Sequence, residues 1–230
     1  MSTDPLGLAE DVDEATQRLL ATAAGLDDAA VRAPSALPGW TRGHVLTHLA
    51  RNADGAVNLL TWARTGVESP QYESWQRRVD DIEAGAGRPA TELLGDLTTA
   101  CARLRAAVAQ MPPQAWSAQV RWTSGGQTPA AEVVWSRLRE VEIHHVDLDA
   151  GYQPTDWPDA FTLRMARFLA RVFGARADGP RLVLDLPEVG HPVPVGEGVA
   201  SPVVTGPAWA AVAWLIGRST GEQLTIEPAG

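Results

Sequence analysis

The sequence predicts an α+β fold in which a helical bundle is followed by a smaller mixed domain. Two features carry this prediction. From Leu6 to about Gly151, long Ala- and Leu-rich stretches of helical periodicity are separated by Pro and Gly. Beyond about Pro180, short β-rich runs alternate with turn residues. We therefore expect two domains, 1–151 and 152–230, in a chain that is long enough to bury a substantial core.

The first domain is predicted to be a four-helix bundle, a fold in which cofactor sites are built from side chains on facing helices. Thr41 is the expected N-cap of the second helix, Pro112-Pro113 closes the third, and Gly151 closes the fourth. The link from Ser69 to Pro89 is long enough to form a crossover or a lid. The four helices are expected at about Leu8–Ala24, from Thr41 onward, at about Ala90–Met111 and at about Pro129–Ala150.

The second domain is predicted to combine two helices with short strands. A helix at about 158–175 begins it, and a second helix at about 207–218 starts with a proline in its first turn. The strands are expected at 181–186, 192–195, 202–205 and 223–226.

The composition excludes several classes of function. A net charge of −9 and a pI near 5.0 argue against nucleic acid or an anionic membrane surface as the main partner. No apolar run reaches the roughly 18 residues of a transmembrane helix, and residues 1–25 lack the features of a signal peptide, so we expect a cytoplasmic protein. The single cysteine, Cys101, excludes an intramolecular disulfide and an all-cysteine metal site, and we interpret it as a packing residue.

Two motifs that are distant in the sequence hold four of the five histidines. His44 and His48 are four residues apart in the second helix, so they lie on nearly the same helical face. Glu140 and His144 have the same spacing in the fourth helix. Two imidazoles and one carboxylate on facing helices can bind a divalent metal and leave one position open, which is typical of catalytic zinc. The alternative is structural, because histidines four apart also occur on ordinary amphipathic helices.

Periodicity does not by itself choose the ligands. At about 100° per residue, His48 lies roughly 40° nearer the apolar stripe of its helix than the histidine one turn before it, which favours His48. In the fourth helix, Glu142 and His145 fall among the apolar positions, whereas Glu140 and His144 lie at the flank of the stripe. Both pairs therefore remain open, and His145 is also explained as a buried, hydrogen-bonded histidine.

Three segments share a pattern with a known family. They are LPGWTRGHVLTHLARN at 37–52, REVEIHHVDL at 139–148 and GRSTG at 217–221. In this order they resemble the mycothiol-dependent maleylpyruvate isomerases of actinobacteria, which belong to the DinB-like metalloenzymes. The resemblance covers essentially the whole chain. It implies a DinB-like four-helix bundle that holds a zinc ion, and a smaller C-terminal domain akin to sterol-carrier folds.

By motif position, the resemblance implies that His48, Glu140 and His144 bind zinc or another divalent metal, and that the other two histidines of the motifs are structural. It also implies that Arg218 is a catalytic and cofactor-binding residue that the C-terminal domain lends to the site. A guanidinium suits the carboxylates of a dianionic substrate or an enolate. From the residues alone, the simpler explanation of Arg218 is its place at a helix C-terminus, where the helix dipole favours a cation.

The resemblance further implies a reaction of aromatic-compound degradation. The thiol of mycothiol would coordinate the metal, ionise, add to the cis double bond of maleylpyruvate and leave after rotation, which yields fumarylpyruvate. One alternative is a mycothiol S-transferase that acts on another electrophile in detoxification or natural-product biosynthesis. Another is a non-catalytic metal-binding protein of the same fold. The implied partners are a small-molecule substrate and a low-molecular-weight thiol, and nothing in the sequence distinguishes a monomer from a homodimer.

Further residues lie close to the implied ligands. Asp147, Asp149 and Asn52 are candidates to orient the imidazoles, although each is also explained as a surface or capping residue. Several of the nine tryptophans lie in or beside helices near the motifs, where they either line an apolar pocket or pack the core. These are Trp40, Trp62, Trp135, Trp209 and Trp214.

Overall fold

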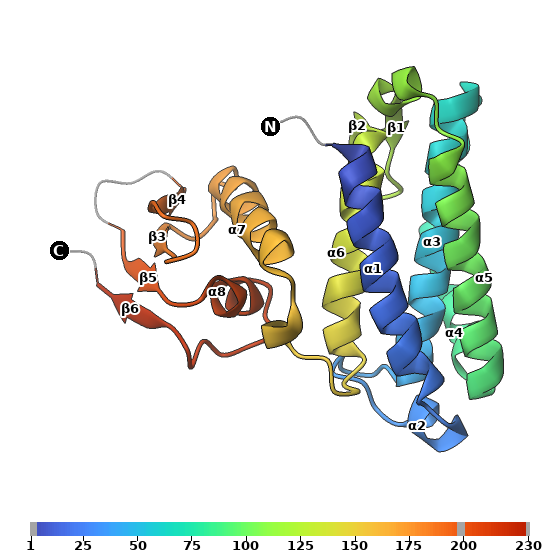
Figure 1. Ribbon diagram of the computed structural model, residues 1–230, viewed down its shortest axis with the longest axis horizontal. Coiled ribbons are helices and arrows are strands. Elements are labelled where there is room, and N and C mark those ends of the chain that lie inside the picture. Colours follow the sequence, from blue (N-terminus) through green and yellow to red (C-terminus); the bar gives the residue numbers. More distant parts are fainter. Residues whose placement is uncertain (1–3, 197–200, 229–230) are drawn as a thin grey trace. The chain divides into compact units, whose positions relative to one another are not determined.

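The computed structural model describes residues 4–196 and 201–228 (Figure 1). Helices and two small sheets make up the chain, and the α+β prediction is confirmed. The chain divides into two compact units, Met1–Tyr152 and Gln153–Gly230. Among the described residues, no helix combines the length and the apolarity that crossing a membrane requires.

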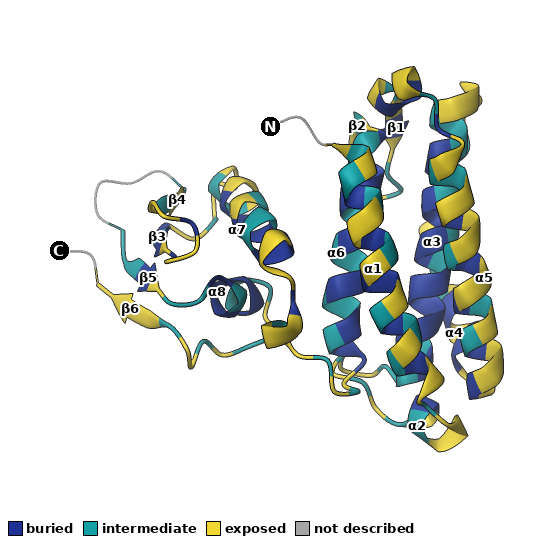
Figure 2. Cartoon of the chain, viewed as in Figure 1, coloured by how far each residue is buried: buried dark blue, intermediate teal, exposed yellow. Residues whose placement is uncertain are grey.

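Four long helices of the first unit form a bundle. They are α1 (Pro5–Ala24), α3 (Arg42–Thr65), α5 (Ala90–Ala109) and α6 (Ala131–Asp147). α3 packs against α5 and α6, and α1 packs against the same two helices. Each contributes a buried apolar face, while the outer faces of α1 and α5 are exposed (Figure 2). Fully buried members of this core include Leu19, Leu49, Leu59, Leu97 and Val141. All four helices were predicted, with ends that differ by a few residues.

The start of α3 is fixed by its cap. The Thr41 side chain accepts a hydrogen bond from the His44 backbone N–H, and the His44 ring accepts one from the Thr41 backbone N–H. This reciprocal arrangement satisfies two N–H groups that the first turn of a helix leaves without partners. The predicted N-cap is therefore confirmed, and His44 completes it.

The link over 69–89 contains a helix that was not predicted, and its role as a crossover or a lid stays a prediction. α4 (Trp75–Ala86) occupies it, capped by Ser74 and packed against α3. The helix was missed because it is short and rich in charged residues, with only three buried positions, so the segment was interpreted as a link. Its contact with α3 is close, since a Cβ atom added to Gly43 would lie 2.2 Å from the carbonyl oxygen of Ala86.

Four smaller elements of the first unit were also not predicted. α2 (Asp28–Arg32) is a short helix before α3. η1 (Pro113–Ser117) is a 3-10 helix that leads into an antiparallel pair of strands, β1 (Gln119–Arg121) and β2 (Gln127–Pro129).

The second unit is a small sheet with two helices. The sheet has the order β4-β3-β5-β6, in which β3 and β5 are parallel and the outer pairs are antiparallel. α7 and α8 pack against each other, and α8 ends three residues before the predicted 218. The elements are η2 (Pro154–Asp156), α7 (Asp159–Gly174), β3 (Leu182–Asp185), β4 (Val193–Val195), β5 (Val203–Thr205), α8 (Ala208–Leu215) and β6 (Thr225–Glu227). Each of the predicted strands is present, and the likeness to sterol-carrier folds stays a prediction.

Candidate metal centre

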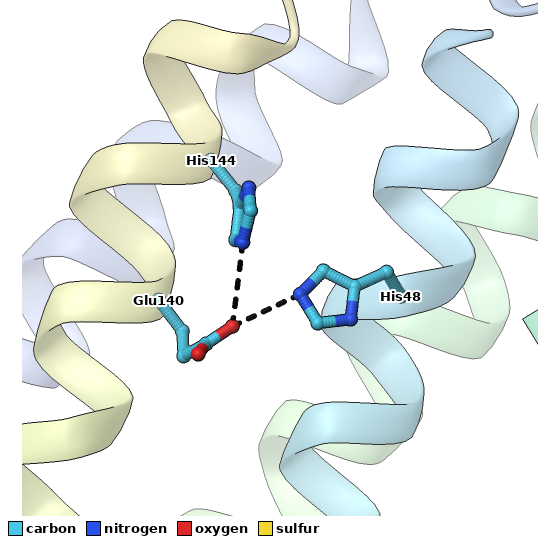
Figure 3. Close-up of side chains that lie close together, drawn as sticks. All are labelled: His48, Glu140 and His144. Carbon is cyan, nitrogen blue, oxygen red and sulfur yellow. Dashed lines mark hydrogen bonds and ion pairs between the residues drawn. The ribbon is translucent and has the colours of Figure 1, made fainter. Parts of the chain in front are cut away.

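Three side chains from two facing helices converge inside the bundle. Glu140 and His144 project from successive turns of α6 toward His48 on α3 (Figure 3). The Nε2 atom of His48 lies 2.9 Å from Oε2 of Glu140, and Nε2 of His144 lies 3.4 Å from the same oxygen. One potential ligand atom from each residue lies within 4.8 Å of the other two. The structure therefore brings together the three residues implied as metal ligands.

The other pair left open by periodicity faces a different helix. Glu142 pairs with Arg18 of α1 at 2.7 Å and accepts a hydrogen bond of 2.6 Å from the Tyr152 hydroxyl. His145 bonds through Nε2 to the Thr22 hydroxyl at 2.8 Å, and its ring stacks on Tyr152 with centroids 3.8 Å apart. These two residues thus join α6 to α1 and lie outside the cluster.

The remaining motif histidine also lies outside the cluster. Besides its role in the cap of α3, His44 places Nε2 3.4 Å from a carboxylate oxygen of Glu83. Trp40 stacks on the His44 ring at 6.0 Å and lies 5.7 Å from the His48 ring, so it forms part of the wall of the cluster. Trp135, by contrast, is a core residue with 2% of its surface exposed.

A buried carboxylate orients one of the imidazoles. Oδ2 of Asp147 lies 2.8 Å from Nδ1 of His144, and Asp147 is 1% exposed. A histidine that donates its Nδ1–H to a carboxylate presents its Nε2 lone pair to a metal, and such a partner is typical of metal-ligating histidines. The other two candidates for this role bond to arginines instead: Asn52 to Arg137 at 2.7 Å and Asp149 to Arg42.

Opposing influences set the protonation of the cluster. Burial, the largest influence, would raise the pKa of Glu140, but hydrogen bonds from His144 and His48 hold that pKa well below its ordinary value. Burial likewise opposes protonation of His144, yet Asp147 and Glu140 raise the pKa of His144 to about 9. For His48, burial dominates and lowers the pKa. Without a metal, the cluster at neutral pH therefore holds an ionised Glu140, a protonated His144 and a neutral His48.

The donor set fits a divalent metal. Two imidazole nitrogens and one carboxylate oxygen are the ligands of catalytic zinc sites that keep a fourth position open. The His48 side chain is 4% exposed, whereas those of Glu140 and His144 are 29% and 17% exposed, so the cluster has a buried side and an accessible side. A fourth ligand could approach from the accessible side.

The family model for the mycothiol maleylpyruvate isomerase N-terminal domain matches residues 12–149. The chain belongs to the mycothiol maleylpyruvate isomerase family. The match contains the first unit's long helices from Val12 onward, including all three clustered residues. The family resemblance of the sequence motifs is thereby confirmed.

Two solved structures of this enzyme family are similar over the whole chain. One is a crystal structure of the mycothiol-dependent maleylpyruvate isomerase, at 30% identity and a TM-score of 0.90. The other is a histidine-to-alanine variant of such an isomerase, at 29% identity and the same TM-score. Each alignment covers 99% of both chains. No curated protein matches the sequence significantly.

Arg218, the residue implied as catalytic in this family, follows α8 in the second unit. Gly217 has a φ of 72°, and its backbone N–H bonds to Trp214 while that of Arg218 bonds to Ala213, which is a glycine-based helix end. The Arg218 guanidinium donates to the Ile216 carbonyl at 2.8 Å. The helix stop thus fixes where Arg218 leaves α8, and its role in the isomerase site stays a prediction.

The sequence interpretation missed one residue that touches the cluster. Arg78 of α4 places Nη2 2.9 Å from Nδ1 of His48. Its guanidinium carbon lies 4.9 Å from the centre of the Trp75 ring and 5.7 Å from that of Tyr72. Arg78 could have been found only if the α4 segment had been recognised as a helix that packs on α3, because α3 carries His48.

Proposed function

We propose that this chain is a zinc- and mycothiol-dependent isomerase that converts maleylpyruvate to fumarylpyruvate. The observation that carries the proposal is the cluster of His48, Glu140 and His144 in a chain that aligns over its whole length with isomerases of this name. Other divalent metals use similar ligands, and zinc is proposed because two imidazoles and a carboxylate are typical of its catalytic sites.

The three side chains would hold the metal through His48 Nε2, a Glu140 oxygen and His144 Nε2. A divalent cation at this position would supply positive charge that favours the ionised form of a nearby thiol. Glu140 is suited to this role because its pKa lies well below the ordinary value, so it is ionised at neutral pH. Asp147 holds the Nδ1 proton of His144 and so keeps Nε2 directed at the cluster.

Mycothiol would supply the reacting thiol, whose reversible addition to the cis double bond permits rotation about that bond. The chain itself offers only Cys101, whose sulfur lies 3.4 Å from the Arg137 guanidinium and is not part of the cluster. The same guanidinium also donates to the Leu49 carbonyl and to Asn52. A nucleophile from a cofactor is consistent with this lack of a cysteine in the cluster.

Arg218 is proposed to bind the substrate. A guanidinium can pair with a carboxylate of a dianionic substrate through two parallel hydrogen bonds, and it can stabilise the negative charge that an enolate carries. Because this charge grows as the thiol adds, such an arginine would favour the reaction itself as well as substrate binding.

The test combines metal analysis with turnover. About one zinc per chain and conversion of maleylpyruvate only in the presence of mycothiol are expected. Bound zinc without turnover would contradict the isomerase and direct the search to other electrophiles, as for an S-transferase. A protein that takes up no metal would contradict the catalytic role of the cluster.

A further inference from the structure

Arg78 is a cation without a carboxylate partner beside the metal centre. Among the residues that the structure describes, no ion pair joins Arg78 to an acidic side chain, and its polar contacts are the His48 ring and the Tyr72 hydroxyl. Its neighbour on α4, Arg77, pairs with Asp81 at 3.0 Å, and Arg51 on α3 pairs with Asp96 at 2.7 Å. Arg78 therefore keeps its capacity to bind an anion.

The hydrogen bonds around His48 have a defined direction. A guanidinium only donates, so Nδ1 of His48 accepts from Arg78. In a neutral imidazole the proton must then be on Nε2, which donates to Glu140 at 2.9 Å. Every polar contact of His48 is thus satisfied in the arrangement that the structure shows.

Metal binding requires the opposite arrangement. If Nε2 of His48 gives its lone pair to a metal, the neutral ring carries its proton on Nδ1. That proton would face the N–H of Arg78, so two donors would meet at 2.9 Å. Ligating histidines ordinarily donate their other N–H to an acceptor. The Arg78 contact and metal ligation by His48 therefore exclude each other.

We propose that Arg78 leaves His48 when a metal occupies the cluster and that its guanidinium then binds a carboxylate of the substrate. This inference rests on the proposed function and adds to the site a second arginine, one that belongs to the same unit as the metal ligands. Because the metal would displace Arg78 from His48, metal binding would free the guanidinium to bind an anionic substrate.

The surroundings of Arg78 allow its side chain to turn while its backbone stays in place. α4 is locked on α3, since a Cβ atom at Gly43 would meet the Ala86 carbonyl and one at Gly85 would lie 2.5 Å from the Thr47 side chain. The movement is therefore confined to side-chain rotation, and the guanidinium stays near the cluster.

Room and support for the turned side chain are present. Arg78 lines a polar cavity of about 280 Å³ whose lining also includes Tyr72 and the carboxylates of Asp54, Glu73 and Asp81. Asp54 and Asp81 already pair with other arginines. The ring of Trp75, whose surface is 58% exposed, offers a face on which a guanidinium can rest while its N–H groups point elsewhere. A planar guanidinium held on such a face is suited to bidentate recognition of a carboxylate.

The first arm of the test measures zinc affinity by competition with a chelator, without thiol or substrate. Arg78→Met keeps the aliphatic stem and removes the donors, so zinc should bind about tenfold more tightly than in the wild type, as expected for loss of one charged hydrogen bond that competes with the metal. Arg77→Met is the matched control on the same helix and should leave the affinity unchanged. Equal affinities in the Arg78→Met and Arg77→Met proteins would overturn displacement by the metal.

The second arm measures binding of maleate, a cis dicarboxylate that needs no turnover, to the zinc-loaded proteins by calorimetry. Arg78→Met should weaken maleate binding at least tenfold, Arg78→Lys should weaken it less, and Arg77→Met should not change it. Unchanged maleate binding in Arg78→Met would refute the substrate role. Because neither arm uses turnover, a protein that binds zinc and maleate through Arg78 but does not isomerise maleylpyruvate would contradict only the proposed reaction.

Discussion

Replacement of Asp147 by Asn should weaken metal binding in a way that depends on pH. Asp147 is 1% exposed, and its carboxylate lies 2.8 Å from Nδ1 of His144. Asn keeps the shape and an oxygen that can accept the same hydrogen bond, but it removes the negative charge. The substitution therefore tests the electrostatic part of the contact.

Two effects of that charge oppose each other. The carboxylate makes His144 a better metal ligand, and loss of such a partner typically costs about 10- to 100-fold in metal affinity. Together with Glu140, Asp147 also raises the pKa of His144 from 6.5 to about 9. At pH 7 the protonated form then outweighs the neutral one by about 100 to 1, so protons compete strongly with the metal. In the Asn variant this pKa falls and the competition weakens.

The expected deficit of Asp147→Asn is therefore largest at high pH. Near pH 9.5, where protons no longer compete, the variant should bind zinc about 10- to 100-fold more weakly than the wild type. Near pH 7 the two proteins should differ by only a few-fold, because the wild type loses more affinity as the pH falls through about 9. Competition with a chelator at both pH values measures this. A deficit of the same size at both would refute the charge argument, and no deficit at pH 9.5 would refute any role for Asp147.

Four further substitutions test the site and its support. His48→Ala should lose metal and activity together, whereas His44→Ala should keep the metal and lose about 1 kcal/mol of stability through the cap of α3; equal metal loss in both, by elemental analysis, would overturn the ligand assignment. Arg218→Ala should retain zinc but lower kcat/KM by at least about 100-fold, as loss of a group that stabilises transition-state charge does; unchanged turnover would return Arg218 to a purely structural role. Gly43→Ala should lower the free energy of unfolding by about 1–3 kcal/mol, because its new methyl would overlap the Ala86 carbonyl at 2.2 Å; an unchanged denaturant midpoint would show that α4 can move away from α3.

The second and fourth helices of the bundle show how far local sequence reasoning reached. The cap at Thr41 and the four-residue spacing of Glu140 and His144 are local properties. The start of α3, the α6 helix and the shared face of Glu140 and His144 therefore followed from the sequence. The α4 helix was missed because it is short, rich in charged residues and buries only three positions, and Arg78 was missed with it.

By itself, the sequence determined the α+β class, the four long helices and, through its three motifs, the family to which the chain belongs. Only the tertiary structure decided which polar face of α6 meets which neighbour. α6 lies between α1 and α3, so Glu142 and His145 are as well satisfied against α1 as Glu140 and His144 are against α3. Periodicity reports which positions are buried, but the packing partner determines their chemistry. The cluster with His48 therefore exists only because the bundle places α3 opposite that one face of α6.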